Sequence, residues 1–302
     1  MSTGRAERPP IGAARSEVLI KSAAVASEPA LEHRNLNVGQ VNLHVTVQGD
    51  GPAVVLLHGF PGFWFTWRSQ LDALSRGGFR AVAPDLRGFN LSDKPRFVDS
   101  YRPDRLTRDV LGLLDALAID RAFIVGHDWG GVIAFRFAGE HPDRVEKLAV
   151  VNAPHPELFR RRILHPRQLM RSWYVGLFQV PVLAEWVVTR PSVVRSALGG
   201  AGLEEAEVEA YVEALRRPGA ASGAMNYYRA ALRERWRAPA VIAAPTLVLW
   251  GERDRALGPE VLSGIERYAR DVRIRRFPDA GHFLLRDRAD EVNRELLAFL
   301  RS

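Results

Sequence analysis

Cysteine is absent from the 302 residues, and its absence excludes several chemistries. Without thiols the chain has no disulfide, no thiolate zinc site, no Cys-ligated iron–sulfur cluster and no cysteine nucleophile. Any nucleophile must therefore be oxygen or nitrogen. A fold that needs no disulfide is compatible with a reducing cytoplasm, which is where we expect this protein to be.

Lysine and long apolar runs are also scarce. Only three of the 42 basic residues are Lys, and the formal net charge is +7. No basic block is longer than Arg160, Arg161 and Arg162, so we expect no nucleic-acid partner. The most apolar run, residues 173–188, is interrupted by Gln, Pro and Glu. It falls short of the ~18 apolar residues that cross a membrane, so we expect no stable membrane insertion.

Residues 1–33 differ in composition from the rest of the chain. They contain no aromatic residue, balance four basic against four acidic side chains, and include Pro9 and Pro10. Their longest apolar stretch is too short for the core of a secretory signal. We predict that they form a flexible N-terminal arm outside the fold.

From residue 34 onward, apolar runs typical of strands alternate with segments of helical length. The predicted strands are 41–47, 54–57, 79–83, 122–125, 148–151, 246–250 and 272–277. Such alternation is typical of an α/β fold, a mainly parallel sheet with helices on both faces. It stops between residues 153 and 239, where prolines separate successive helical segments. We therefore predict a core of residues 34–152 and 240–302, with residues 153–239 inserted as a helical cap.

Candidate functional residues follow three of the predicted strands. Asp128 lies in Gly126-His127-Asp128-Trp129-Gly130-Gly131 after strand 122–125, Asp254 follows strand 246–250, and His282 follows strand 272–277. In an open parallel sheet the chemistry sits at the carboxyl ends of the strands, so these side chains are expected to meet. The glycines around Asp128 suit a nucleophile elbow, a strained strand-to-helix turn that exposes one side chain.

An aspartate nucleophile selects the reaction class. If it attacks an sp3 carbon it becomes an alkyl ester, and water can then attack the ester carbonyl. A serine would leave an inert ether instead. An aspartate that attacked an ester substrate would form an anhydride, so ordinary esterase chemistry is disfavoured. The alternative interpretation of Asp128 is a turn residue that caps the following helix, but a His and a second Asp on later junctions favour catalysis.

Two further motifs carry a family resemblance. His58-Gly59-Phe60-Pro61-Gly62-Phe63-Trp64 follows strand 54–57, and Asp85-Leu86-Arg87-Gly88 follows strand 79–83. Together with the elbow they resemble the α/β-hydrolase-fold epoxide hydrolases, which are related to haloalkane and haloacetate dehalogenases. The resemblance runs from about residue 40 to the end of the chain. It implies an eight-stranded, mostly parallel sheet flanked by helices, with an inserted helical cap domain.

The resemblance also implies roles for individual residues. Asp128 would be the nucleophile, His282 the acid–base and Asp254 the acid that orients the histidine. The backbone N–H groups of Phe60 and Trp129 would form the oxyanion hole. The reactants implied are a small-molecule epoxide and water, with no cofactor or metal, in a monomer or homodimer.

Tyrosines in the cap separate epoxide opening from halide release. An epoxide oxygen leaves as an alkoxide, whose conjugate acid has a pKa near that of water, ~16, and a tyrosine of pKa ~10 can protonate it. A halide leaves without a proton. By resemblance, Tyr174 and Tyr228 match the two epoxide-activating tyrosines, whereas Tyr227 is a neighbour without that role. A core tyrosine whose hydroxyl reaches the surface is the alternative interpretation.

Aromatic residues are candidates for an apolar substrate pocket between core and cap. Phe63, Trp64, Trp129 and Phe178 are the predicted substrate-binding residues, although core packing explains each about as well. A dehalogenase using the same Asp–His–Asp set and a non-catalytic ligand-binding homologue remain open. Phe60, where haloalkane dehalogenases often have Asn, and Trp129, where fluoroacetate-type enzymes typically have Arg, depart from the dehalogenase patterns.

Overall fold

The computed structural model describes residues 30–199, 203–233 and 241–302. Most of the predicted arm, residues 1–33, lies outside the described residues, and its flexibility stays a prediction. The first strand begins at Glu32, so the last residues assigned to the arm belong to the sheet instead.

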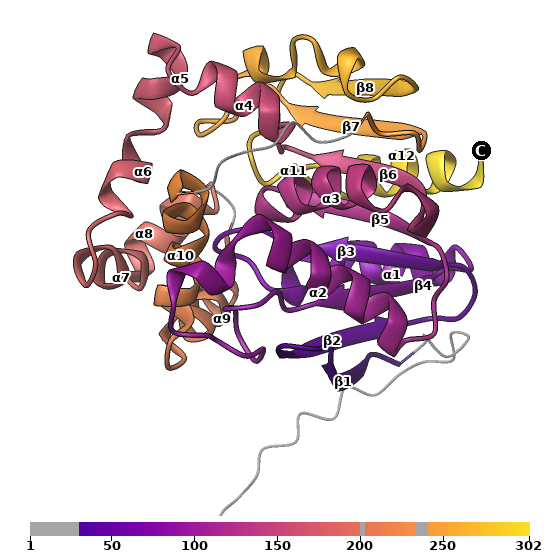
Figure 1. Cartoon of the computed structure of the whole chain (residues 1–302), viewed down its shortest axis with the longest axis horizontal. Helices are drawn as coiled ribbons and strands as arrows, with labels where there is room; N and C mark the ends of the chain where they lie inside the picture. Colours follow the sequence, from indigo (N-terminus) through magenta and orange to yellow (C-terminus); the bar gives the residue numbers. More distant parts are fainter. Residues whose placement is uncertain (1–29, 200–202, 234–240) are drawn as a thin grey trace, which may run out of the picture.

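Eight strands form one sheet, which Figure 1 shows in the core. Their spatial order is β1-β2-β4-β3-β5-β6-β7-β8. β2 is antiparallel to both of its neighbours, and all other pairs are parallel. The predicted eight-stranded, mostly parallel sheet is therefore confirmed. The strands are β1 (Glu32–Asn37), β2 (Asn42–Gln48), β3 (Ala53–Leu57), β4 (Arg80–Pro84), β5 (Ala122–His127), β6 (Val145–Val151), β7 (Thr246–Gly251) and β8 (Val272–Phe277).

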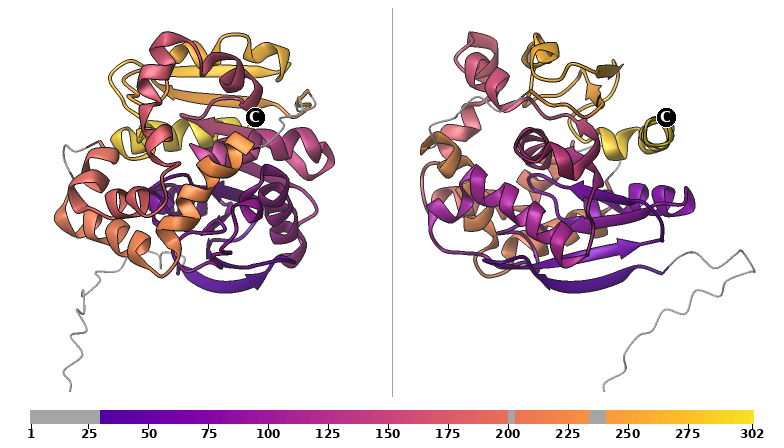
Figure 2. Two further views of the ribbon diagram at one scale, coloured as in Figure 1. Left: turned by 60° about the vertical axis from the view of Figure 1, so that its left-hand side comes forward. Right: turned by 45° about the vertical axis from the view of Figure 1, so that its right-hand side comes forward.

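Each face of the sheet packs against its own helices. Along β3, Val55 and Leu57 belong to one apolar cluster, while Val54 and Leu56 belong to the other, because successive side chains of a strand point to opposite faces. α2 (Pro103–Ala116) and α3 (Trp129–Glu140) cover the first face. α1 (Arg68–Arg76), α11 (Leu284–Asp287) and α12 (Ala289–Arg301) cover the second; the oblique right-hand view of Figure 2 shows helices on both sides of the sheet.

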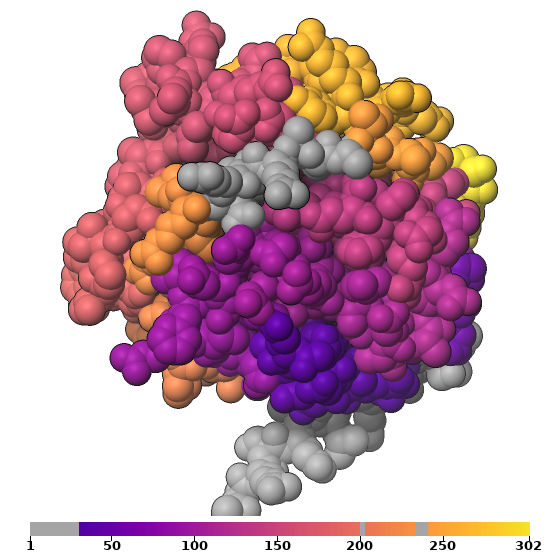
Figure 3. Space-filling view, viewed as in Figure 1, coloured from indigo at the N-terminus to yellow at the C-terminus, as the bar shows by residue number. Residues whose placement is uncertain are grey.

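Between β6 and β7, residues 152–199, 203–233 and 241–245 are described, and they contain seven α-helices that form the cap. They are α4 (Pro156–Arg162), α5 (Pro166–Arg171), α6 (Trp173–Leu177), α7 (Leu183–Val188), α8 (Pro191–Ala197), α9 (Glu205–Arg216) and α10 (Ala220–Arg233). Three of them begin with proline, whose fixed φ suits the first helical position. The space-filling view shows the cap packed directly on the core (Figure 3).

Short 3-10 helices complete the described structure: η1 (Trp64–Trp67), η2 (Val98–Tyr101), η3 (Pro142–Arg144), η4 (Pro259–Leu262) and η5 (Ile265–Arg267). Within the described ranges, none of the helices combines the length and the apolar character needed to cross a bilayer.

Arg87 forms a buried ion pair within the core and also contacts the cap. The guanidinium of Arg87 donates to both carboxylate oxygens of Asp109 on α2, at 2.7 and 2.5 Å, and both side chains are almost fully buried. Arg87 also donates to the carbonyl of Ser100, at 2.9 Å. Its own carbonyl accepts a hydrogen bond from the hydroxyl of Tyr227 on α10, at 2.9 Å. One residue therefore connects the end of β4 with α2, η2 and the cap.

Asp109→Asn is expected to destabilise the fold by about 3 kcal/mol, because it leaves a buried guanidinium without its counter-charge. Urea unfolding measures the loss. The matched control is Glu252→Gln, which breaks the exposed pair with Arg276 and should cost at most about 1 kcal/mol. Equal losses in the two variants would contradict this account of the Arg87–Asp109 pair.

Candidate active site

Asp128 lies in the turn between β5 and α3, and its backbone is strained. Its φ is 52° and its ψ is −123°, a combination that non-glycine residues rarely adopt. The turn depends on Gly130, where a Cβ would come within 2.0 Å of the Leu57 carbonyl oxygen. The predicted strand–turn–helix context is therefore present, and it lifts the carboxylate out of the sheet.

Two backbone N–H groups hold this carboxylate. The Phe60 N–H donates to Asp128 Oδ2 at 2.8 Å, and the Trp129 N–H also donates to the carboxylate. Gly59 makes the close approach feasible, since a Cβ there would lie 2.3 Å from Oδ2. The structure thus brings both predicted oxyanion-hole residues to the Asp128 carboxylate, where negative charge would develop during ester hydrolysis.

His282 lies between two carboxylates. Its Nδ1 is 2.7 Å from Asp254 Oδ2, a hydrogen-bonding distance in which Nδ1–H donates. Its Nε2 is 3.8 Å from Asp128 Oδ1, too far for a direct hydrogen bond. The imidazole is therefore held by Asp254 and turned toward Asp128, so the structure brings together all three residues of the predicted Asp–His–Asp set.

Asp254 is itself fixed by three further donors. The Asn152 side chain donates to Oδ2 at 2.9 Å, and the backbone N–H groups of Ala256 and Leu257 donate to Oδ1 at 2.8 and 2.9 Å. Asn152 was not among the candidate residues of the sequence analysis. The structure shows that its amide supports the acid, and the sequence signal for this was its place at the end of β6.

His127 was also missed as a structural partner of the site. It is buried, and its Nε2 lies 2.9 Å from the His282 carbonyl oxygen. Burial, joined by the charge of His282, lowers the pKa of His127 to about 3. The ring is therefore neutral near pH 7, with Nε2–H donating to that carbonyl and holding the His282 loop against the elbow.

The charges around His282 set its protonation. Burial alone would lower the pKa of His282, but the charge of Asp254, the hydrogen bond to it and the charge of Asp128 outweigh burial and raise it to about 9. Burial also works against ionised Asp254, but His282 and the surrounding donors lower the pKa of that carboxyl below its ordinary value. Burial raises the pKa of Asp128, while His282 and the two N–H donors oppose that rise.

An apolar cavity of about 150 Å³ lies over Asp128. Trp129, Tyr174 and Tyr228 line it together with the nucleophile candidate. The two tyrosine rings are 6.1 Å apart between centroids. Burial, followed by the charge of Asp128, raises the pKa of both phenols, so both carry their protons near neutral pH. The other lining residues are Val132, Pro154, Pro156, Phe159, Arg160, Ile163, Val175, Ala231, Leu232 and Leu257.

Three of the four predicted substrate-binding residues are not among the residues lining this cavity; only Trp129 is. Phe178 packs behind Tyr228, with ring centroids 4.8 Å apart. Phe63 is buried against Tyr211, and the Trp64 ring contacts His33. For Phe63 and Trp64, core packing is therefore the better explanation. The aliphatic lining was missed because it comes from separate segments whose composition does not distinguish them from core.

No metal-binding arrangement is evident at the site. Within the described ranges, no group of three or more His, Asp or Glu side chains is placed to hold a metal ion.

Comparison with known proteins gives the family. The pattern of the alpha/beta hydrolase fold matches residues 52–289. The chain therefore belongs to the α/β-hydrolase family. Within that family it is related to the epoxide hydrolases: it is 38% identical over 276 residues to Epoxide hydrolase 3 of Xenopus tropicalis, a match covering 86% of this chain and 75% of that protein.

Two bacterial proteins are similar over nearly their whole length. The AB hydrolase superfamily protein YfhM of Bacillus subtilis is 35% identical over 280 residues, covering 88% of this chain and 97% of YfhM. The crystal structure of an epoxide hydrolase from Bacillus megaterium in complex with an inhibitor superposes with a TM-score of 0.83 at 32% identity. That match covers 89% of this chain and 100% of the other.

Neutralising Asp128 is expected to lower the pKa of His282. In Asp128→Asn one of the three carboxylates that favour the imidazolium is gone, while Asp254 and Asp287 remain. His282 should be cationic below pH 9 in the wild type, as its pKa of about 9 requires, and should lose its proton at a lower pH in the variant. NMR titration of the histidines measures both values.

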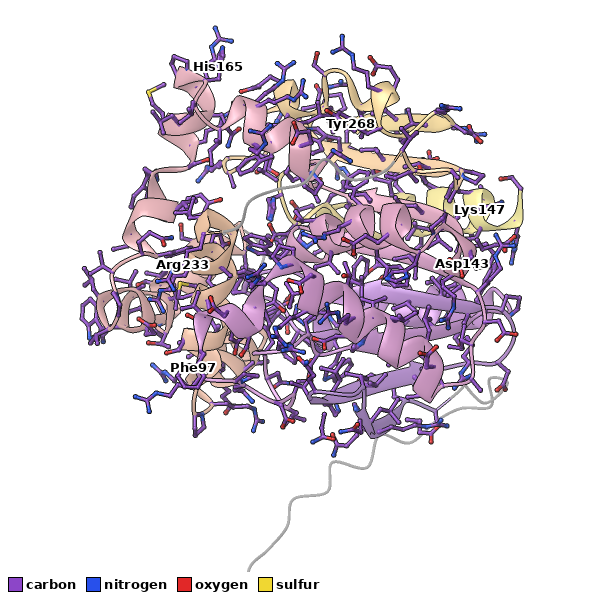
Figure 4. All side chains as sticks on the ribbon, viewed as in Figure 1. Phe97, Asp143, Lys147, His165, Arg233 and Tyr268 are labelled. Atoms are coloured by element: carbon purple, nitrogen blue, oxygen red, sulfur yellow. The ribbon has the colours of Figure 1, made fainter. Side chains whose placement is uncertain are left out.

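The control for that titration is Asp143→Asn. Asp143 is exposed and lies on the far side of the core from the cap (Figure 4), so its removal should leave the His282 titration unchanged. An Asp128→Asn protein that titrates like the wild type would show that Asp128 does not act on the imidazole.

Proposed function

We propose that this protein is an epoxide hydrolase that works through a covalent ester on Asp128. The observation that carries the proposal is the composition of one cavity, which is lined by a carboxylate positioned for attack and by two tyrosines that retain their protons. Attack on carbon and protonation of oxygen are the two requirements of epoxide opening. The epoxide-hydrolase names of the relatives support the same activity.

The first step is ring opening. Oδ2 of Asp128 is held by the Phe60 N–H, whereas Oδ1 faces His282, so Oδ1 is the oxygen free to attack. As the Oδ1–carbon bond forms, the epoxide carbon–oxygen bond breaks, and Tyr174 or Tyr228 gives its proton to the departing oxygen. The product is a hydroxyalkyl ester of Asp128 and a phenolate.

The second step is hydrolysis of the ester. Esterification removes the charge of Asp128, which lowers the pKa of His282. The imidazolium therefore releases its Nε2 proton to solvent, and regains one when Asp128 is charged again after turnover. The neutral Nε2 can then take a proton from water. The hydroxide attacks the ester carbon, and the N–H groups of Phe60 and Trp129 hold the oxyanion. Collapse breaks the acyl–oxygen bond and releases a vicinal diol. Of the two water protons, one reaches the leaving alcohol through His282 and the other restores the tyrosine.

Trp129 favours epoxide opening over halide release. Its side chain donates a hydrogen bond to Tyr228, and the two rings meet edge-on with centroids 5.1 Å apart. Because the phenol oxygen accepts this bond, its own O–H remains available to donate into the cavity. An indole N–H engaged in this way is not free to bind a departing halide, which is what the dehalogenase alternative requires of it.

The double substitution Tyr174→Phe and Tyr228→Phe is expected to reduce the rate of diol formation by about 10²–10⁴-fold, the usual contribution of general acid catalysis. Chromatographic measurement of diol from small aryl and alkyl epoxides tests this. The same variant should retain the fold, because the phenyl rings keep their packing and only the Trp129–Tyr228 hydrogen bond between core and cap is lost.

Tyr227→Phe is the matched control, since Tyr227 adjoins Tyr228 on α10 but donates to the Arg87 carbonyl instead. It should keep full activity at a cost of about 1 kcal/mol in stability. Two results together would overturn the proposal in favour of a dehalogenase. The wild type would form no diol from any epoxide, and the double variant would still release halide from alkyl halides.

A further inference from the structure

Exposed apolar side chains are concentrated on one part of the cap. Of fourteen large hydrophobic residues that are exposed in the described part of the chain, eight fall between residues 164 and 186. This segment contains α5, α6 and α7, which form the outer edge of the cap in Figures 1 and 2. We call this set of residues the cap edge: Leu164, Leu169, Met170, Trp173, Val180, Val182, Leu183 and Trp186.

The degree of exposure is large for residues of this type. Val182 is 80% exposed, Leu164 78%, Met170 71% and Trp173 69%. Single exposed apolar residues are ordinary on protein surfaces, but their concentration over three successive helices marks a site of interaction.

The accessible charge around the cap edge is positive. Residues 156–199 contain seven Arg and only two acidic residues, Glu157 and Glu185. Glu157 is buried and accepts hydrogen bonds from Arg160 and Arg161, and Glu185 accepts one from Arg229. Arg160 and Arg161 are thus paired with Glu157, and Arg171 and Arg195 are paired with Glu260 and Glu205. Of the seven arginines, Arg162, Arg167 and Arg190 form no ion pair within the described ranges, and they carry the accessible positive charge.

Arginines flank the cap edge at both ends. Arg167 on α5 is exposed, and no ion pair is recorded for it among the described residues. The Arg190 guanidinium lies over the Trp186 ring, 3.9 Å from its centroid, and is likewise exposed. Apolar side chains bordered by arginine, with Trp among them, are the composition of a surface that binds at a lipid–water interface.

A cavity at the α5 end adds a site for an anionic group. It measures about 350 Å³ and lies between the cap and the η5 region of the core. Three of its lining residues are arginines, Arg161, Arg162 and Arg267, and His165 lines it as well. One acid, Glu266, is also present. Figure 4 labels two of the lining residues, His165 on the cap and Tyr268 on the core. The size and charge suit the phosphate of a lipid headgroup.

The same charges disfavour a second copy of this chain as the partner. A two-fold dimer through the cap edge would bring two surfaces of the same positive charge together, and like charges across an interface are unfavourable. An anionic lipid surface has the opposite charge and accepts apolar side chains at its boundary.

We propose that the cap edge docks this protein on membranes that contain anionic phospholipids. Docking is peripheral: the apolar side chains of α5–α7 enter the interface, and the flanking arginines pair with lipid phosphates. The proposal concerns a surface outside the catalytic cavity, and it stands or falls independently of the epoxide-hydrolase reaction.

Vesicle co-sedimentation with the purified full-length chain tests the proposal. We expect binding to vesicles of equal parts phosphatidylcholine and phosphatidylglycerol, and much weaker binding to phosphatidylcholine alone. Raising the salt concentration from about 0.1 M to about 1 M should weaken binding, because it screens the arginines. Inorganic phosphate at moderate concentration should not displace the protein if the lipid surface, rather than the free anion, is the partner.

Two double variants separate the apolar contribution from the charge contribution. Met170→Ser with Trp173→Ser should weaken vesicle binding by about tenfold or more. Arg167→Ser with Arg190→Ser should weaken it by about fivefold for each arginine removed. The control for the apolar variant is Ile274→Ser on β8, which removes exposed apolar area away from the cap edge. The control for the charge variant is Arg273→Ser on β8 with Arg294→Ser on α12, which removes two positive charges away from the cap edge.

Several results would overturn the proposal. Failure to bind either kind of vesicle is one, and equal binding to both is another. Variants of the cap edge that bind as tightly as their controls would show that another surface is responsible. A wild-type mass in light scattering that is twice that of the Met170→Ser, Trp173→Ser protein would assign the cap edge to a second copy instead. Circular dichroism checks that each variant is folded.

Discussion

The site depends on one backbone constraint, the strained turn at Asp128. A φ of 52° at a non-glycine residue persists only where the surroundings enforce it, and here the close packing of Gly130 against Leu57 does so. The turn places the carboxylate where the Phe60 N–H binds one oxygen and His282 faces the other. With an unstrained turn, the Asp128 carboxylate would not lie where the Phe60 and Trp129 N–H groups and the His282 imidazole can all reach it. The oxyanion hole, the orientation of His282 and the role of Asp254 all follow from this position.

The cap supplies the half of the chemistry that the core lacks. The core offers a carboxylate, an imidazole and backbone N–H donors, but no acid for a leaving oxygen. The cap brings Tyr174 and Tyr228 over the same carboxylate, and burial raises the pKa of both phenols so that they keep their protons. The hydroxyl of Tyr227 donates to the Arg87 carbonyl, which adds a contact between α10 and the core.

Much of the core was predictable from the sequence, because strands buried on both faces are continuous apolar runs. β3, β5 and β7 were found in this way, and the residues that follow β5, β7 and β8 converge as a parallel sheet requires. β1 was not found, since Glu32–Asn37 is a polar edge strand with no apolar periodicity. The support that Asn152 gives Asp254 was missed because it depends on side-chain geometry between β6 and β7. For Phe63 and Trp64 the sequence left core packing and substrate binding equally open, because an aromatic residue suits both; the structure places both rings against other aromatic rings.

The central claim is that Asp128 becomes covalently attached to substrate, and mass spectrometry of a stalled enzyme tests it most directly. In His282→Gln the ester should form but not hydrolyse. After exposure to a mixture of small epoxides and alkyl halides, the peptide that contains Asp128 is expected to gain the mass of one intact epoxide. A plain alkyl group on that peptide would identify a dehalogenase. Continued diol formation with no adduct on Asp128 would contradict the covalent mechanism altogether.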